Sequence, residues 1–204
     1  SKKGSTGLTV NQSSGTGIID WSSFSIGKGN TVRFDNGSGA TLNRVMGGNL
    51  SRIAGSLSAT GSVYLINTQG VIVSRTGRVN TGGGFFASSR DQSDSDFLNN
   101  KRKFSGTSKG NVVNEGHIRS ANGDVALIGH AISNSGTLSA KNGTASLNAA
   151  NHVLLRPEGS PILIRGGLGD ASNSGTIAGA QAQLNAAGGN VDALAGNNDG
   201  IIRA

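Results

Sequence analysis

The sequence has no cysteine, only two prolines and few aromatic residues, which make up 4% of its 204 residues. Without cysteine there can be no disulfide bonds, thiolate zinc sites or cysteine nucleophiles. No apolar run approaches the ~18 residues of a membrane-spanning helix. Because hydrophobic residues amount to 34% and large ones are scarce, the core must be built from many small aliphatic side chains.

Charge is also sparse, at 14% of the residues, although the net charge is +7. The basic residues are scattered, and the one tight cluster is Lys101-Arg102-Lys103, with Phe97 and Phe104 nearby. No recognisable nucleic-acid-binding motif accompanies this cluster. A solvated basic surface is therefore the favoured interpretation, and nucleic acid is not expected as a partner.

Glycine and asparagine instead recur in a pattern. The segments Asn114–Gly123 and Asn134–Gly143 are alike at an offset of 20 residues, and Gly55–Ala59 resembles Gly77–Thr81 at an offset of 22. A third copy, Asn173–Ala180, lies 39 residues beyond the second, which is nearly two periods. Such self-similarity at a fixed period is typical of repeat architectures.

The runs between these turns are short and aliphatic, as in Val63–Ile66 and Val125–Ile128. Their β-branched residues, flanked by Gly and Asn, predict strands, and no stretch has a clean helical period. Antiparallel hairpins also contain short strands, but they do not require a repeat of about 20 residues, whereas stacked coils do. The sequence thus predicts an all-β stack of parallel strands, in which corner asparagines hydrogen-bond from coil to coil.

Two segments interrupt the repeat. Residues 88–111 are rich in Ser, Asp, Lys and Arg, and we predict a hairpin or mobile loop that leaves the coil. Residues 151–170 contain both prolines and form a second predicted excursion, with its own strand at Ile162–Ile164.

The open end of a stack needs cover, for which residues 1–20 are the candidate. The expected organisation is one domain, residues 1–204, with a cap (1–20), first coils (21–87), an excursion (88–111), coils (112–150), a second excursion (151–170) and final coils (171–204).

An ordered series of segments carries a family resemblance, namely Ile18–Gly27, Ala40–Gly48, Ser51–Leu57 and Gly61–Val71. This series resembles the N-terminal secretion domain of the two-partner secretion family, which includes filamentous haemagglutinins, large adhesins, haemolysins and contact-dependent inhibition toxins. The resemblance covers about residues 18–90. It implies a right-handed parallel β-helix with an N-terminal cap and extra-helical excursions.

The resemblance also implies a function. Such a domain is recognised in the periplasm of a Gram-negative bacterium by the soluble domains of a dedicated outer-membrane β-barrel transporter. It leads a large adhesin or toxin to the cell surface or the extracellular space and nucleates its β-helix. The candidate recognition residues are Asn43 and Arg44, by their position in the matched stretch, and Asn67 and Gly70, which open and close a turn; all four could equally be folding determinants.

This chain departs from the family at that turn. The family usually has Asn-Pro-Asn-Gly, whereas here Thr68 and Gln69 stand between Asn67 and Gly70. A turn can keep its shape with these residues, because Asn favours its first position and Gly its last. The second family motif, Asn-Pro-Asn-Leu, is absent, which points away from the haemagglutinin-type branch.

Two other functions are compatible with parts of the sequence. A surface adhesin could bind a host glycan or receptor through its excursion loops, with Lys101, Arg102 and Lys103 as the candidate residues. A β-helix polysaccharide lyase could use Ca²⁺ held by Asp91, Asp94 and Asp96. Neighbouring cations, Arg90 among them, compete for these carboxylates, so a flexible self-neutralising loop is favoured over a metal site.

The remaining chemical motifs are weak. Gly106–Gly110 matches G-x-S-x-G, but the nucleophile elbow needs a strand before the serine and a helix after it, and no helix is expected here. His117, His130 and His152 are interpreted as surface or corner residues, and Trp21 and Phe24 as contacts between cap and core. We therefore expect no catalytic residue, no metal, no cofactor and a monomeric protein.

Overall fold

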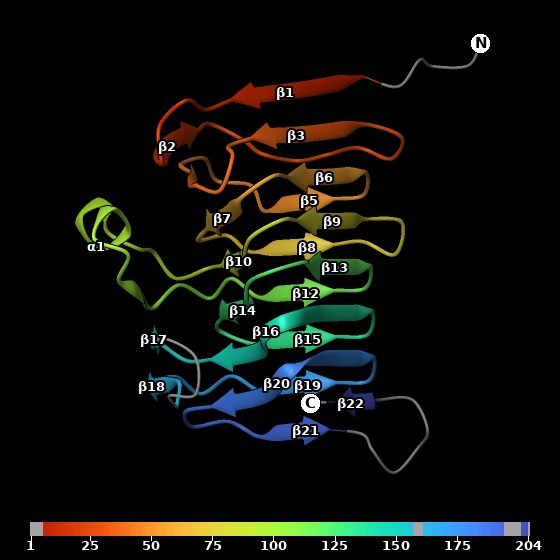
Figure 1. Ribbon diagram of the computed structural model, residues 1–204. Coiled ribbons are helices and arrows are strands. Elements are labelled where there is room, and N and C mark those ends of the chain that lie inside the picture. Colours follow the sequence, from red (N-terminus) through yellow and green to blue (C-terminus); the bar gives the residue numbers. More distant parts are fainter. Residues whose placement is uncertain (1–5, 157–160, 194–200, 204) are drawn as a thin grey trace.

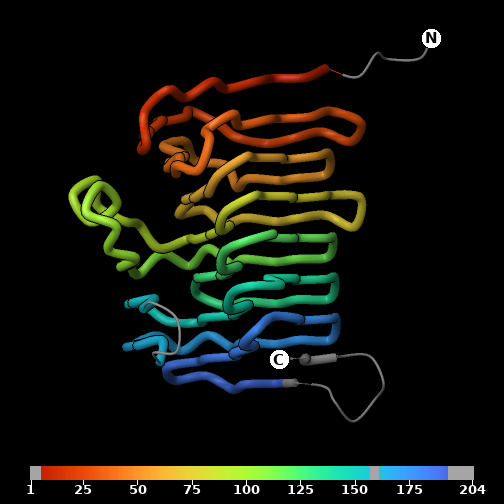
Figure 2. Tube along the Cα trace, in the orientation of Figure 1, coloured from red at the N-terminus to blue at the C-terminus, as the bar shows by residue number. Residues whose placement is uncertain are grey.

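The computed structural model describes residues 6–156, 161–193 and 201–203. The chain winds into a stack of coils whose strands are parallel from coil to coil (Figures 1 and 2). The sequence-based prediction of an all-β parallel β-helix is thus confirmed.

The strands of the described residues form three sheets. A 13-stranded sheet folds back on itself, because the long strands β16 and β20 each contribute to two faces of the coil. One face holds β1 (Gly7–Asn11), β3 (Thr31–Asp35), β6 (Ser56–Ala59), β9 (Arg78–Thr81), β13 (His117–Ser120), and the first halves of β16 (Thr137–Ala149) and β20 (Thr176–Ala186), followed by β22 (Ile201–Arg203). The second face holds β2 (Thr16–Trp21), β4 (Ala40–Val45), β7 (Ser62–Asn67), β10 (Phe85–Ser88), β14 (Val125–Gly129) and the second halves of β16 and β20.

A six-stranded sheet closes the coil on its third side. It contains β5 (Ser51–Ile53), β8 (Val71–Val73), β12 (Val112–Asn114), β15 (Ile132–Asn134), β19 (Ala171–Asn173) and β21 (Val191–Ala193). The third sheet is antiparallel and lies outside the coil; it joins β11 (Arg102–Ser105), β17 (His152–Leu155) and β18 (Leu163–Arg165).

Aliphatic side chains stack in register along the axis of the coil. One ladder of buried residues runs through successive coils as Val32, Leu57, Val79, Ile118, Leu138 and Ile177. Each such side chain contributes about 1.5–3 kcal/mol by its removal from water. A narrow core of this kind needs few aromatic residues, in keeping with the composition.

The asparagine ladder predicted at the corners is also present. The amide nitrogen of Asn114 donates to Oδ1 of Asn134 at 2.7 Å, and that of Asn134 donates to Oδ1 of Asn173 at 2.6 Å. Asn134 and Asn173 lie on neighbouring strands, β15 and β19. The interpretation of their 39-residue spacing as nearly two periods was therefore wrong: it is one coil lengthened by the second excursion.

The described part of the predicted cap continues the parallel ladder. Strand β1 pairs with β3, and β2 pairs with β4. Val10, Ile19 and Trp21 pack against the end of the core. The rings of Trp21 and Phe24 meet edge to face at 5.5 Å, so these two aromatics join the first coil to the interior.

The first excursion differs from the predicted hairpin or mobile loop. It is closed at its base by an antiparallel bridge between Asp91 and Ser105, and it holds the helix α1 (Asp94–Leu98), which Ser93 caps, followed by β11. This helix has five residues, and no helix within the described ranges is long and apolar enough to cross a membrane.

The second excursion supplies β17 and β18, the latter overlapping the predicted strand at Ile162–Ile164; Pro157 lies outside the described residues. The two excursions pair with each other through β11 and β17. They cover an apolar outer face of the coil, where Tyr64 stacks on Phe86 at 4.3 Å and meets Phe97 and Phe104 from the first excursion. The excursions thus close a second core, outside the coil.

Candidate functional site

The turn after β7 is held by the side chain of its first residue. Asn67 is fully buried; its Nδ2 donates to the carbonyl oxygen of Asn49 and to Oγ of Ser51, each at 3.0 Å. Its Oδ1 accepts a hydrogen bond from the backbone N–H of Gln69 at 2.9 Å. The N–H of Gly70 donates to the carbonyl oxygen of Asn67 and closes the turn. Asn67 therefore fixes the turn, while Thr68 and Gln69 stand exposed at its tip.

Gly70 adopts a backbone conformation that only glycine enters readily, with φ at +118°. A Cβ at this position would lie 2.7 Å from the carbonyl oxygen of Asn111. The turn and the segment that ends the first excursion therefore approach each other closely because residue 70 has no side chain.

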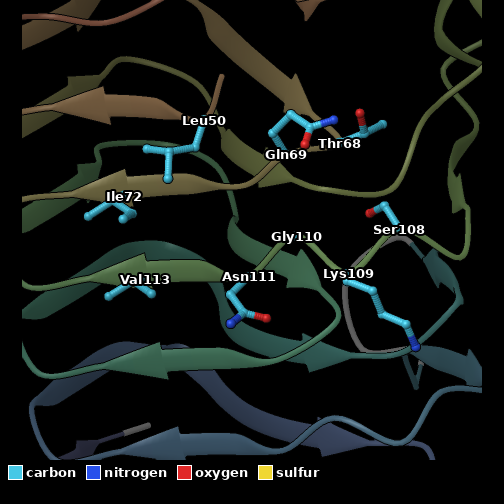
Figure 3. Close-up of a pocket in the computed structure, with 9 residues that line it drawn as sticks. All are labelled: Leu50, Thr68, Gln69, Ile72, Ser108, Lys109, Gly110, Asn111 and Val113. Atoms are coloured by element: carbon cyan, nitrogen blue, oxygen red, sulfur yellow. The ribbon is translucent and has the colours of Figure 1, made fainter. Parts of the chain in front are cut away.

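An open groove of about 570 Å³ lies beside this turn (Figure 3). Its apolar residues are Leu50, Ile72 and Val113, and the last two are paired on β8 and β12. Its polar residues come from the tip of the turn and from the end of the first excursion, and they are Thr68, Gln69, Ser108, Lys109 and Asn111. The groove therefore combines an apolar floor with a polar rim that carries one cation.

Asn43 faces the interior of the coil. On β4 it lies in register between Ile19 and Leu65, and it is fully buried. Its Oδ1 accepts from Nε1 of Trp21 at 3.0 Å, and its Nδ2 donates to the carbonyl oxygen of Tyr64 at 3.2 Å. Because its amide is satisfied by its own coil and its neighbours, Asn43 has the contacts of a folding determinant.

Arg44, the next residue, faces outward and holds the first excursion. Its guanidinium forms ion pairs with Asp94 at 2.7 Å, Asp91 at 3.1 Å and Asp20 at 3.3 Å, and it donates to the carbonyl oxygen of Gln92. Burial alone lowers the pKa of Arg44, but its hydrogen bonds and charge attraction to Asp94 and Asp91 outweigh burial, so the pKa is raised. Of the three aspartates expected to be neutralised by Arg90 and its neighbouring cations, Asp91 and Asp94 pair with Arg44 instead.

Arg90 has a role that the sequence did not reveal. Its side chain is fully buried, and Nε donates to the carbonyl oxygen of Ala150 at 2.7 Å. Its terminal nitrogens donate to the carbonyl and hydroxyl oxygens of Ser108 and to Oδ1 of Asn151. Burial lowers its pKa. Because its partners lie in both excursions, Arg90 binds one to the other.

The basic cluster is divided between two environments. Arg102 pairs with Asp124 at 2.6 Å, and its guanidinium lies 5.1 Å from the centre of the Phe86 ring. Lys101 and Lys103 are exposed. Binding of a receptor or glycan by Lys101, Arg102 and Lys103 stays a prediction, and Arg102 is already engaged within the protein.

Ser108, the serine of the G-x-S-x-G match, makes hydrogen bonds that hold the excursion in place. The hydroxyl of Ser108 donates to the carbonyl oxygen of Ser89 at 2.8 Å and accepts from Nη1 of Arg90. A serine nucleophile needs a base at this place, whereas Arg90 is a cation. In the described part of the chain, no group of three His, Cys, Asp or Glu residues could hold a metal ion.

The four predicted recognition residues therefore do not form one site. Asn67 and Gly70 shape the turn beside the groove, Asn43 faces the core, and Arg44 faces the first excursion. Sequence reasoning missed Leu50, Ile72 and Val113. Leu50 is an isolated leucine and the other two lie in short aliphatic runs, and neither pattern indicates that the three side chains share an open groove.

Comparisons with known proteins agree on one family. The family model described as "TPS secretion domain" matches residues 1–202. A heme/hemopexin-binding protein of Haemophilus influenzae is 37% identical over 145 residues, which are 66% of this chain and 16% of that protein. Another protein of the same description and species is 44% identical over 78 residues, which are 37% of this chain and 8% of that protein.

A solved structure shares the fold. The crystal structure of the HMW1 secretion domain from Haemophilus influenzae superimposes with a TM-score of 0.67 at 27% identity, and the match covers 79% of this chain and 50% of that one. The chain thus spans about half of this structural relative and a small part of the two curated relatives.

Proposed function

The chain belongs to the TPS secretion domain family, and from this premise we propose that it directs export of a longer protein by presenting the groove beside the Asn67–Gly70 turn to an outer-membrane transporter. The domain is a secretion-targeting module, and its family is one of secretion rather than catalysis. The observation that carries the proposal is the turn itself: Asn67 buries its side chain to hold two exposed residues at the rim of an apolar groove.

The composition of the groove indicates the kind of segment that fits it. Leu50 is 39% exposed, and Ile72 and Val113 are half-buried, so an apolar side chain of the partner can be taken out of water there. Lys109 at the rim favours a partner with a carboxylate close to that apolar residue. We therefore propose an extended segment from the soluble periplasmic domains of the transporter as the occupant.

Coil formation is the second part of the proposal. The last long strand, β20, keeps Ala182, Leu184 and Ala186 only partly buried against the core. A further coil stacked on β20 would bury these side chains and pair its backbone. Coils that add outside the cell in this way would draw the following chain outward and make export unidirectional.

The test compares two leucines with different surroundings. Leu50→Gln removes an apolar wall of the groove, whereas Leu168→Gln changes a side chain that is 82% exposed elsewhere. In cells that carry the cognate transporter, we expect Leu50→Gln to lower the secreted amount, with the purified periplasmic domains binding it about tenfold more weakly. Leu168→Gln should be secreted like the wild type.

Two further variants separate recognition from folding. Asn67→Ala leaves the buried hydroxyl of Ser51, the carbonyl of Asn49 and the N–H of Gln69 without their partner, so it should impair folding and secretion together. The double variant Thr68→Ala/Gln69→Ala changes only exposed side chains at the tip, so it should fold normally and bind the transporter more weakly. Full secretion of both the Leu50 variant and the tip variant would exclude the groove as the recognition site.

A further inference from the structure

Cationic side chains gather on the face of the coil formed by β3, β6, β9 and β13, which lie side by side in Figure 1. Arg33, Arg78 and Arg119 point outward from this face and are exposed. Lys28 and Arg75 lie in turns between this face and the six-stranded sheet, Arg52 lies on β5 of that sheet, and all three are exposed. We call these six residues the basic face.

The register of the sheet sets the positions of the three arginines. Arg33 pairs with Ser58, Ser58 with Asn80, and Asn80 with Arg119, so Arg33 and Arg119 stand in one column. With neighbouring strands about 4.8 Å apart, these two arginines are separated by about 14 Å along the axis. Arg78 stands in the next column and pairs with His117. The three arginines therefore follow the axis of the coil, with Arg78 two strands beyond Arg33 and Arg119 one strand beyond Arg78.

Within the described residues, none of these six cations forms an ion pair. The ion pairs of the described residues join Arg44 to its three aspartates and Arg102 to Asp124, all on the side of the excursions. The carboxylates nearest in sequence to the basic face, Asp35 and Glu115, form no ion pair with it. Arg52 makes only a 3.4 Å hydrogen bond to the hydroxyl of Ser74. Asp35, which stands exposed on β3 two residues from Arg33, is the one carboxylate on strands β3, β6, β9 and β13.

The rest of the surface is flat and rich in hydroxyl and amide groups. Between the arginines stand Thr31, Ser56, Ser58 and Asn80, which can donate to and accept from sugar hydroxyls. Of the described outward-facing residues on these four strands, none is Phe, Tyr or Trp. Single-stranded nucleic acid is bound largely by stacking of its bases on such rings, so the face is poorly suited to it.

We propose that the basic face binds a linear anionic polysaccharide, with its sulfate or carboxylate groups on Arg33, Arg78 and Arg119 and its axis along the coil. Guanidinium groups bind such anions through paired hydrogen bonds, and the hydroxyl-bearing residues between them contact the sugar rings. This activity is separate from transporter recognition, because Arg33, Arg78 and Arg119 stand on the 13-stranded sheet, whereas Ile72 and Val113 of the groove stand on the six-stranded sheet.

The test uses the purified chain and heparin as a sulfated probe. The variant Arg33→Gln/Arg78→Gln/Arg119→Gln removes three charges from the basic face. The comparison variant Lys101→Gln/Lys103→Gln/Arg165→Gln removes three exposed charges from the excursions, and it tests at the same time the glycan binding expected of Lys101 and Lys103 from the sequence. At physiological salt we expect the first variant to bind heparin about tenfold more weakly than the wild type, and the comparison variant to bind within about twofold of it.

Further variants and a second probe distinguish specific binding by the basic face from general attraction of anions. A variant with lysine at the three arginine positions should keep part of the affinity, and all variants should unfold at the wild-type urea concentration, because the changed side chains are exposed. Double-stranded DNA of equal charge should bind more weakly than heparin. Equal losses in the two charge-removing variants, a loss confined to the comparison variant, or tighter binding of DNA would overturn the proposal.

Discussion

Asn134 and Asn173 are 39 residues apart in the sequence, yet the amide of one donates a 2.6 Å hydrogen bond to the amide of the other. The contact exists because residues 151–170 leave the coil and return to it one strand further along, so that β15 and β19 are neighbours. Both amides are buried at a corner, where water cannot replace a lost partner. The ladder that runs from Asn114 through Asn134 to Asn173 therefore stabilises the coil on either side of the second excursion.

Replacing the middle residue of this ladder should be costly. In Asn134→Ala, the amide of Asn114 and the Oδ1 of Asn173 lose their contacts with residue 134 inside the protein. A buried polar group without a partner costs about 1–3 kcal/mol, so we expect a loss of about 3 kcal/mol in the free energy of unfolding. The midpoint of urea denaturation measures it.

Ser135→Ala is the control for this variant, because Ser135 is adjacent and exposed. It should change stability by less than about 0.5 kcal/mol. If Asn134→Ala unfolds at the same urea concentration as Ser135→Ala, the ladder contributes no stability.

The parts of the fold that were predictable are those that the repeat enforces. Stacked coils place equivalent residues in register, so the repeated Asn-Gly turns and aliphatic runs sufficed to predict the sheets and the asparagine ladder. The repeat does not predict the contacts of the excursions, because these contacts depend on where the chain folds back onto the coil. Arg44 and Asp94 are 50 residues apart, and Arg90 and Ala150 are 60 apart; no periodicity relates them.

The candidate site shows the same division. The turn from Asn67 to Gly70 could be predicted from its end residues, since Asn and Gly are favoured at those positions. The groove beside it could not, because it combines Leu50, Ile72 and Val113 from separate coils with the end of an excursion. Register brings the aliphatic residues together, but only the path of residues 108–111 turns them into a groove.

Arg44 should control how firmly the first excursion is held. In Arg44→Met, Asp91 and Asp94 lose their shared cation, although both carboxylates are more than half exposed. Ion pairs of this kind contribute about 1 kcal/mol or less. We therefore expect amide hydrogen exchange in residues 91–105 to become about fivefold faster, with exchange in β13 unchanged.

Arg119→Met is the matched control, since it removes an exposed arginine that forms no ion pair within the described residues. It should leave exchange in residues 91–105 as in the wild type. Wild-type exchange in Arg44→Met would mean that the apolar contacts of Phe97 and Phe104 hold the excursion without Arg44.

Replacing Arg90 should lower the stability of the protein more than replacing Arg44, because Arg90 is fully buried. Arg90→Met keeps the apolar stem but leaves the oxygens of Ala150, Ser108 and Asn151 without this donor. Hydrogen bonds to charged groups contribute about 1.5–3 kcal/mol each, partly offset by the cost of burying the charge, so a net loss of about 3 kcal/mol is expected. Urea denaturation measures this loss, and trypsin should cut faster after Lys109.

Arg90→Lys completes that experiment. Lysine keeps the charge but lacks the planar fork that reaches several oxygens at once, so it should restore little of the lost stability. Wild-type stability of Arg90→Lys would mean that the charge alone, and not the set of hydrogen bonds, joins the two excursions.

The ionisation of Tyr64 tests the second core, which the excursions close outside the coil. Burial raises the pKa of its phenol above the ordinary 10.0, while the nearby Arg102 opposes the shift. Because the folded protein favours the neutral phenol, its contribution to stability is fully present below pH 10.0 and is lost as the pH rises through the folded pKa. Tyr64 is the sole tyrosine, so the near-ultraviolet absorbance of its phenolate reports this pKa directly.

Two variants check the assignment. Arg102→Gln should raise the pKa of Tyr64 further, because it removes the cation that favours the phenolate. Tyr64→Phe should remove the corresponding part of the alkaline loss of stability. A phenol that titrates at its ordinary pKa in the folded protein would show that the excursions do not keep Tyr64 out of water.

Gly70 tests whether the close approach of the turn to the first excursion matters beyond backbone strain. Gly37 is its matched control, because it also has a positive φ, +58°, but a Cβ there would meet no atom within 4 Å. Gly37→Ala should therefore cost about 1 kcal/mol, from the left-handed conformation alone. Gly70→Ala adds the greater strain of φ +118°, which lies outside the left-handed well, and a contact with backbone atoms of Asn111. That contact can be relieved only by moving the segment that borders the groove, so a loss of about 3 kcal/mol is expected. Secretion should fall in Gly70→Ala and persist in Gly37→Ala, whereas equal stability losses would mean that Asn111 moves freely and that the groove has no fixed shape on that side.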